Sequence, residues 1–131
     1  MDPPAGRHVL VVDDDDDVRV ITQMSLETVA GWRVRAARGG AEALDLLREE
    51  RPDAVLLDVM MPGMDGPATF RAMQADPDLR DVPVVLLTAK LHVGREQPWD
   101  GLAVAGVIAK PFDPMSLAGQ VAALVGWDAR A

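Results

Sequence analysis

Five polar residues stand at or just after the ends of short apolar runs: Asp13, Asp14, Asp58, Thr88 and Lys110. Carboxylates that share one site raise one another's pKa, and a hard divalent cation such as Mg²⁺ relieves that repulsion. A lysine beside such a cation suits the transfer of a phosphoryl group, whose charge must be neutralised. An aspartate can accept that group directly as an acyl phosphate. The residue types therefore indicate metal-assisted phosphoryl chemistry.

Short apolar runs supply the strands that would position these groups. A continuous run of branched residues such as Val9–Val12 is typical of a strand buried on both faces. The predicted strands are 9–12, 32–36, 54–57, 83–87 and 106–109. Helical patterns follow the strands, which predicts an α/β fold: a doubly wound, five-stranded parallel sheet with helices on both faces. The carboxyl ends of such strands meet at one edge, where ligands bind.

Residues suited to a buried helix face recur every three to four positions in two segments, and this spacing predicts the first and last helices. The first helix is indicated by Val18, Ile21, Met24 and Thr28. The carboxylates of residues 15–17 are expected in its first turn and at its N-cap, where the helix dipole favours negative charge. The last helix is predicted to have Asp113 as N-cap and Pro114 as its first residue. Its expected buried residues are Leu117, Val121, Leu124 and Val125.

The segment 91–103 is an unfavourable sequence for the helix expected between the last two strands. It contains Gly94, Pro98 and Gly101, and a proline inside a helix costs about 3 kcal/mol. We predict a short, kinked or partly unwound helix here, with Trp99 near the break.

Composition restricts the class of protein. The chain has 131 residues, 49% of them apolar, and no cysteine, which fits one domain without disulfides or thiolate metal sites. Its formal charge of −8 argues against direct binding to nucleic acid. It has neither a signal-peptide pattern nor the apolar run of about 20 residues that a membrane span needs. These features predict a cytoplasmic protein: a domain at 8–127, tails at 1–7 and 128–131, and no output domain.

Four segments carry a family resemblance: VVDDD at 11–15, LDVMMPGMDG at 57–66, LTAK at 87–90 and KPF at 110–112. Together they resemble the receiver domain of two-component response regulators, the CheY-like family, over roughly residues 8 to 127. The resemblance implies a flavodoxin-like sheet of strand order 2-1-3-4-5. It also implies that Asp58 accepts phosphate from a sensor histidine kinase or phosphotransfer protein. The domain would catalyse only its own phosphorylation and dephosphorylation.

The same resemblance assigns the other site residues. Asp14, Asp58 and the backbone carbonyl of Met60 would bind Mg²⁺ directly, and Asp13 would bind it through water. Thr88, Ala89 and Lys110 would form the phosphate-binding switch, with Thr88 and Lys110 each bonding a phosphoryl oxygen. The Lys110–Pro111 peptide bond would be cis, which occurs in about 5% of X–Pro bonds.

One residue departs from the family pattern. Many receivers have an aromatic switch residue three positions before the lysine, and Val107 stands there in this chain. We expect output to use backbone shifts of the loop 88–90 and of the segment 91–103 instead. The downstream target protein would bind the surface of that segment, the strand at 106–109 and the last helix.

Three other functions are weighed against this one. A Mg²⁺-dependent aspartyl-phosphate phosphatase of the haloacid dehalogenase type needs a second aspartate two residues after the first, where Met60 stands. A flavodoxin-like cofactor binder needs a hydroxyl-rich loop at 13–15, which is all aspartate. A pseudo-receiver that binds partners without phosphorylation remains open, as does the oligomeric state. His8 and His92 look peripheral and receive no role.

Overall fold

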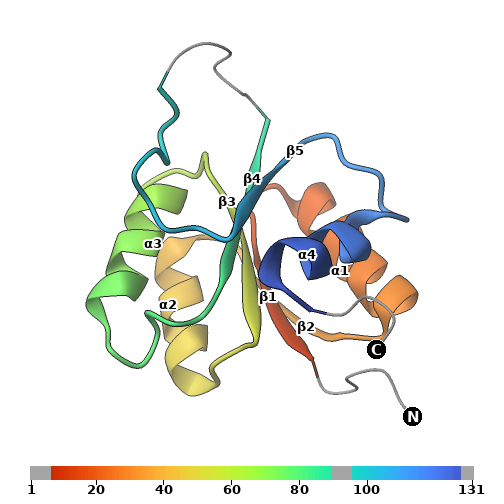
Figure 1. Cartoon of the computed structure of the whole chain (residues 1–131), viewed down its shortest axis with the longest axis horizontal. Coiled ribbons are helices and arrows are strands. Elements are labelled where there is room, and N and C mark those ends of the chain that lie inside the picture. The colour runs from red at the N-terminus through yellow and green to blue at the C-terminus, as the bar shows by residue number, and fades with distance from the viewer. Residues whose placement is uncertain (1–6, 90–95, 128–131) are drawn as a thin grey trace.

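The computed structural model describes residues 7–89 and 96–127, and a parallel sheet forms its centre (Figure 1). The strands are β1 (His8–Val12), β2 (Arg33–Ala37), β3 (Ala54–Asp58), β4 (Val84–Thr88) and β5 (Gly106–Ala109). Their order is β2-β1-β3-β4-β5, and every neighbouring pair is parallel. The predicted α/β fold and strand order are confirmed.

Helices cover both faces of the sheet (Figure 1). They are α1 (Asp16–Ala30), α2 (Gly40–Glu49), α3 (Gly66–Ala75) and α4 (Leu117–Val125). Helices α1 and α4 lie on one face, and α2 and α3 lie on the other. Strands β1, β3 and β4 are buried along their whole length, which is why their sequences are continuously apolar rather than alternating. No helix among the described residues has the length and apolar character to span a membrane.

The register of the sheet aligns the strand ends that carry the polar residues. Val12 pairs with Leu57 in the next strand, Asp58 pairs with Leu87, and Thr88 pairs with Ala109. The backbone N–H of Lys110 donates to the carbonyl of Thr88 at 2.8 Å. Four strand ends therefore finish at nearly the same level, at the edge where the sequence places its chemistry.

Helix α1 forms as predicted, but its apolar stripe does not face the core. Ile21 is 49% exposed and Met24 is 58% exposed, whereas Thr22, Ser25 and Leu26 are buried. The hydroxyl of Thr22 donates to the backbone of its own helix at 2.6 Å, and that of Ser25 donates to a carbonyl in the β5–α4 loop. Satisfied hydroxyls can be buried at little cost, so periodicity identified the helix but not its inner face.

The last helix starts later than predicted. Residues 113–116 form a turn in which the backbone N–H of Ser116 donates to the carbonyl of Asp113, and α4 begins at Leu117. Asp113 therefore caps this turn, through the N–H of Met115, rather than the helix. Leu117 and Val121 are buried as expected, but Leu124 is 37% exposed.

The segment 96–105 contains no helix. Residues 98–101 form a turn, with Gly101 at a φ of 83° and the backbone N–H of Leu102 donating to the carbonyl of Trp99. Trp99 is nonetheless only 9% exposed and packs into the core on the α2/α3 face. We predicted a short, kinked or partly unwound helix over 91–103, whereas its described part, 96–103, has no helical residue. Residues 91–95 lie outside the described residues.

His8 is not peripheral, contrary to expectation. It is 4% exposed in β1, and neither ring nitrogen has a hydrogen-bond partner. Burial, followed by the charge of Arg33, lowers its pKa, so the ring is neutral near pH 7. Its backbone exchanges hydrogen bonds with Asp53, which fixes the start of β1. His92 lies outside the described residues.

Candidate functional site

Three carboxylates from the ends of β1 and β3 meet at the carboxyl edge of the sheet. One oxygen each of Asp13, Asp14 and Asp58 lie within 4.8 Å of one another. Asp13 is fully buried, Asp58 is 5% exposed, and Asp14 is exposed. The cluster is therefore buried on the sheet side and open to solvent on the other. The sequence predicted all three members.

Lys110, at the end of β5, neutralises part of this charge. Its Nζ donates to Oδ2 of Asp13 at 2.8 Å and to Oδ1 of Asp58 at 3.2 Å. Burial alone would lower the lysine pKa, but the bond to Asp13 and the charge of Asp58 outweigh burial and raise it. Lys110 thus stays protonated and bridges the two buried carboxylates.

The ionisation of Asp58 is strongly perturbed. Burial first, and then the charge of Asp13, raise its pKa from 3.8 to about 6, against the opposing effect of Lys110. The charge of Lys110 therefore does not compensate for the burial of Asp58 and the charge of Asp13. A further cation at this point would stabilise the ionised form of Asp58.

The cluster fits a Mg²⁺ ion by its donor chemistry. Mg²⁺ selects oxygen ligands at about 2.1 Å, so two opposite ligands on one ion lie about 4 Å apart, and it keeps several waters. Carboxylates within 4.8 Å of one another, one of them solvent-exposed, meet these requirements. Asp13, Asp14 and Asp58 are the residues that would hold the ion. Met60, two residues after Asp58, is 67% exposed, and the role of its carbonyl stays a prediction.

The first turn of α1 is fixed as the sequence predicts. The carboxylate of Asp15 accepts the backbone N–H groups of Asp17 and Val18, which makes Asp15 the N-cap. Asp16 and Asp17 lie in the first turn and are exposed. None of these three carboxylates is therefore a member of the acidic cluster.

The predicted switch residues flank the acidic cluster. Thr88 is 2% exposed at the end of β4, and Ala89 is exposed just beyond it. The Lys110–Pro111 peptide bond is cis. Val107 is half-buried against the α2/α3 core, on the same side as Trp99. The structure thus brings Asp13, Asp14, Asp58 and Lys110 together and places Thr88 at the end of the strand next to β3. The roles of these residues remain predictions.

Gly66 is a positioning residue that sequence reasoning missed. A Cβ atom on Gly66 would lie 2.5 Å from the carbonyl oxygen of Asp58 and 2.9 Å from Cα of Val59. The N–H of Gly66 donates to the carbonyl of Val59 at 2.9 Å. Helix α3 therefore starts in direct contact with the backbone of Asp58. The glycine at the end of the motif 57–66 was the available signal.

An apolar groove adjoins the acidic cluster, and we call it the α1 groove. Its volume is about 450 Å³, and it is lined by Val18, Ile21, Ala89, Lys110, Pro111, Phe112 and Pro114. A shallower hollow of about 250 Å³ continues it past Met24 and Met115, which are 58% and 72% exposed. Exposed apolar side chains in one patch are typical of protein-binding surfaces.

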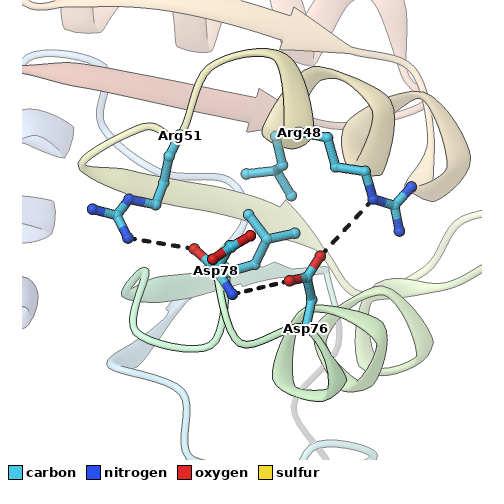
Figure 2. A pocket seen from close by; sticks show the side chains of 6 residues that line it. Arg48, Arg51, Asp76 and Asp78 are labelled. Carbon is cyan, nitrogen blue, oxygen red and sulfur yellow. Dashed lines mark hydrogen bonds and ion pairs between the residues drawn. The ribbon is translucent and has the colours of Figure 1, made fainter.

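A second hollow, of about 330 Å³, lies between the C-terminal ends of α2 and α3 (Figure 2). Nε of Arg48 lies 4.0 Å from a carboxylate oxygen of Asp76, and Arg51 donates to the carbonyl of Asp78 at 3.4 Å. These helices run antiparallel to the strands, so this hollow is at the edge opposite Asp58. Of its described lining residues, only Arg48 and Asp76 form a charge pair, because Arg51 bonds a backbone carbonyl, and no residue of the acidic cluster lines this hollow.

Comparison with known proteins agrees with this geometry. Residues 9–122 match the family described as the response regulator receiver domain. The chain is 39% identical over 117 residues to the response regulator MprA of Mycolicibacterium vanbaalenii, covering 89% of this chain and 49% of that protein. The chain thus spans about half the length of the curated relatives it matches.

Solved structures show the same likeness. The chemotaxis protein CheY4 of Vibrio cholerae superposes with a TM-score of 0.83 at 29% identity, over 92% of this chain and 99% of that one. A CheY-like receiver domain protein of Methanospirillum hungatei has a TM-score of 0.77 at 38% identity, over 91% and 94% of the chains. The chain therefore belongs to the response regulator receiver domain family.

Proposed function

We propose that Asp58 accepts a phosphoryl group, with the help of Mg²⁺, from a histidine kinase or phosphotransfer protein, and that this modification switches a protein-binding surface. The observation that carries the proposal is the convergence of Asp58 with two other carboxylates and Lys110 at one sheet edge. Membership of the receiver family supports a place in two-component signalling. The donor, the ion and the phosphorylated residue are our proposal.

The transfer is a displacement at phosphorus. An oxygen of Asp58 attacks in line, the new O–P bond forms, and the P–N bond to the donor histidine breaks, leaving the donor imidazole to take up a proton. Bound Mg²⁺ supplies charge neutralisation for the carboxylates and the phosphoryl oxygens. Lys110 exchanges its bond to Asp58 for one to a phosphoryl oxygen, and Thr88 donates to another. The domain in this way catalyses only its own phosphorylation and dephosphorylation.

The phosphatase alternative has less support. A phosphatase turning over external substrates needs a general acid for the leaving group, and Met60 occupies the place where that family has an aspartate. A pseudo-receiver would not need three carboxylates clustered at one sheet edge and a lysine bonded to two of them. We therefore favour phosphorylation over both alternatives.

Output is proposed to follow a population shift. Charge-assisted bonds of about 1.5–3 kcal/mol each, from Thr88 and Lys110 to the phosphoryl group, would change the ratio of two conformations by one to three decades or so. Because Val107 has no ring to reorient, the shift would act on the loop after Thr88 and on the segment 96–105. The target would bind this segment, β5 and α4.

A small phosphodonor tests the proposal directly. With Mg²⁺ present, intact mass is expected to show one added phosphoryl group on the wild-type protein and none on Asp58→Asn. Asp78→Asn, an exposed aspartate at the opposite edge, is the matched control and should still gain the group. An adduct that persists in Asp58→Asn would refute the site, and no adduct on the wild type would favour the pseudo-receiver.

We propose that the α1 groove holds a helix of the donor protein, because it is apolar and ends at Lys110 beside Asp58. Ile21→Asp should slow transfer from a phosphohistidine-bearing phosphotransfer protein by at least about tenfold, the effect of losing one central apolar contact. Val20→Asp is the control, because Val20 has the same 49% exposure on α1 but does not line the groove. Phosphorylation by the small phosphodonor should be unchanged in both. Equal slowing by the two variants would contradict the assignment.

A further inference from the structure

We infer that Arg19 is a positioning residue for the metal-binding edge, acting through the backbone of Asp13. This inference rests on the proposed function, because it concerns how the carboxylates are presented to Mg²⁺. Arg19 lies in α1, and its guanidinium reaches back to the end of β1, where Nη1 donates to the carbonyl oxygen of Asp13 at 2.9 Å. Its side chain is only 11% exposed, so this contact is largely screened from water.

Arg19 completes a set of restraints on Asp13. The backbone N–H of Asp13 donates to the carbonyl of Ala37 at 3.1 Å, which ties it to β2. Its Oδ1 accepts the N–H of Asp15 at 2.9 Å, and its Oδ2 accepts Nζ of Lys110 at 2.8 Å. The carbonyl is the remaining polar group, and Arg19 bonds it. A backbone carbonyl that lost this partner would be free to reorient.

The carbonyl of Asp13 belongs to the peptide unit that joins Asp13 to Asp14. A peptide unit is planar, so fixing its oxygen also fixes the direction in which the chain enters Asp14. Asp14 is the exposed member of the cluster, whereas its two neighbours are buried among strand ends. Fewer side chains therefore surround its carboxylate than surround those of Asp13 and Asp58, and the direction of its backbone helps to set its position. Arg19 holds that backbone.

The positive charge of Arg19 does not oppose the cation, because it is locally paired. Its Nη2 forms an ion pair with the carboxylate of Asp16, and this hydrogen bond, followed by the charge of Arg19, lowers the pKa of Asp16. Asp16 lies one turn before Arg19 on the same helix, so it also orients the guanidinium toward Asp13. The two terminal nitrogens of the guanidinium thus bond different partners, Asp13 and Asp16. A lysine has a single nitrogen and can replace only part of this arrangement.

The test measures Mg²⁺ binding without reference to phosphorylation. The dissociation constant is obtained from the rise in melting temperature with Mg²⁺ concentration, since a ligand of the folded state stabilises it by mass action. Arg19→Met keeps the apolar stem but removes the donors, and it should weaken Mg²⁺ binding by about tenfold or more, as loss of an outer-shell partner does. Arg19→Lys should recover most of this loss. Arg48→Met, at the opposite edge, should bind as the wild type does.

Each other outcome would overturn the inference. Arg19→Met with wild-type Mg²⁺ affinity would show that the contact to Asp13 is dispensable. Equal weakening in the Met and Lys variants would show that a donor restored at position 19 does not recover Mg²⁺ binding, and would contradict the role of the bond to Asp13. If Arg19→Met does not fold, Arg19→Leu, which also lacks donors, replaces it, with wild-type affinity again overturning the inference. A wild-type protein that binds no Mg²⁺ would instead contradict the proposed function itself.

Discussion

Replacing Asp58 with asparagine is expected to stabilise the metal-free protein while removing its phosphorylation site. Burial and the charge of Asp13 raise the pKa of Asp58 from 3.8 to about 6, so ionising this group in the folded state is unfavourable. A shift of this size corresponds to about 3 kcal/mol at most. The asparagine side chain would resemble the neutral acid in shape, and we expect the free energy of unfolding to rise by about 2–3 kcal/mol at about pH 8.

The sign of the pH dependence follows from the raised pKa. Between pH 3.8 and about 6 the folded state binds more protons at Asp58 than the unfolded state does. Protonated Asp58 therefore stabilises the folded state at low pH. This stabilisation is lost as the pH rises through about 6, the pKa of Asp58 in the folded protein. The difference in unfolding free energy between Asp58→Asn and the wild type should be small at about pH 4 and should reach its full size at about pH 8.

Urea unfolding in the presence of a chelator, at several pH values, measures this difference. His8, whose lowered pKa acts in the opposite direction, is common to both proteins and cancels in the comparison. Asp78→Asn serves as the control and should show no such pH-dependent gain. If Asp58→Asn were less stable than the wild type at about pH 8, burial and the charge of Asp13 would not destabilise the ionised form of Asp58, and the argument for a cation there would fail.

Replacing Gly66 with alanine is expected to be the most destabilising single-methyl change at the site. The added Cβ would lie 2.5 Å from the carbonyl oxygen of Asp58 and 2.9 Å from Cα of Val59, and both atoms are backbone. Neither can move without shifting β3 against α3. We expect a loss of about 3 kcal/mol of unfolding free energy, at the upper end of overpacking costs, measured by urea unfolding.

Gly119→Ala is the matched control for this prediction. Gly119 is exposed within α4, and its added Cβ would meet nothing within 4 Å. Alanine is a better helix former than glycine, so this variant should gain about 0.5–1 kcal/mol. Wild-type stability in Gly66→Ala would mean that α3 can withdraw from Asp58 at no cost, and the positioning role of Gly66 would be wrong.

Strand β1 and helix α1 show where local patterns suffice and where they do not. The run 9–12 predicted a buried strand because a strand covered on both faces has no polar position, and the prediction needs no knowledge of its neighbours. In α1 the period predicted a helix, but the apolar stripe of Ile21 and Met24 is exposed. Which face turns inward depends on partners from other elements, here the carbonyl of Pro114 that accepts the hydroxyl of Ser25.

The segment 96–105 also shows one feature that local patterns predict and one that they do not. Proline and glycine predicted a failing helix, which is a local property of the backbone. That Trp99 would still be buried is not local, because it depends on the space left on the α2/α3 face of the sheet. Likewise, the helical spacing of apolar residues in the last helix predicted that Leu124 would be buried. In the structure Leu124 is 37% exposed and packs over Gly106 at the sheet edge.

The sequence by itself determined the strands, most of the helices and the polar residues at the strand ends, because these follow from local periodicity and from motif spacing. Only the tertiary structure decided the distances on which the chemistry depends. Lys110 contacts Asp13 and Asp58 across 97 and 52 positions of the chain, and Arg19 reaches the carbonyl of Asp13. Such contacts arise from strand register and helix packing, which join residues that no local pattern relates.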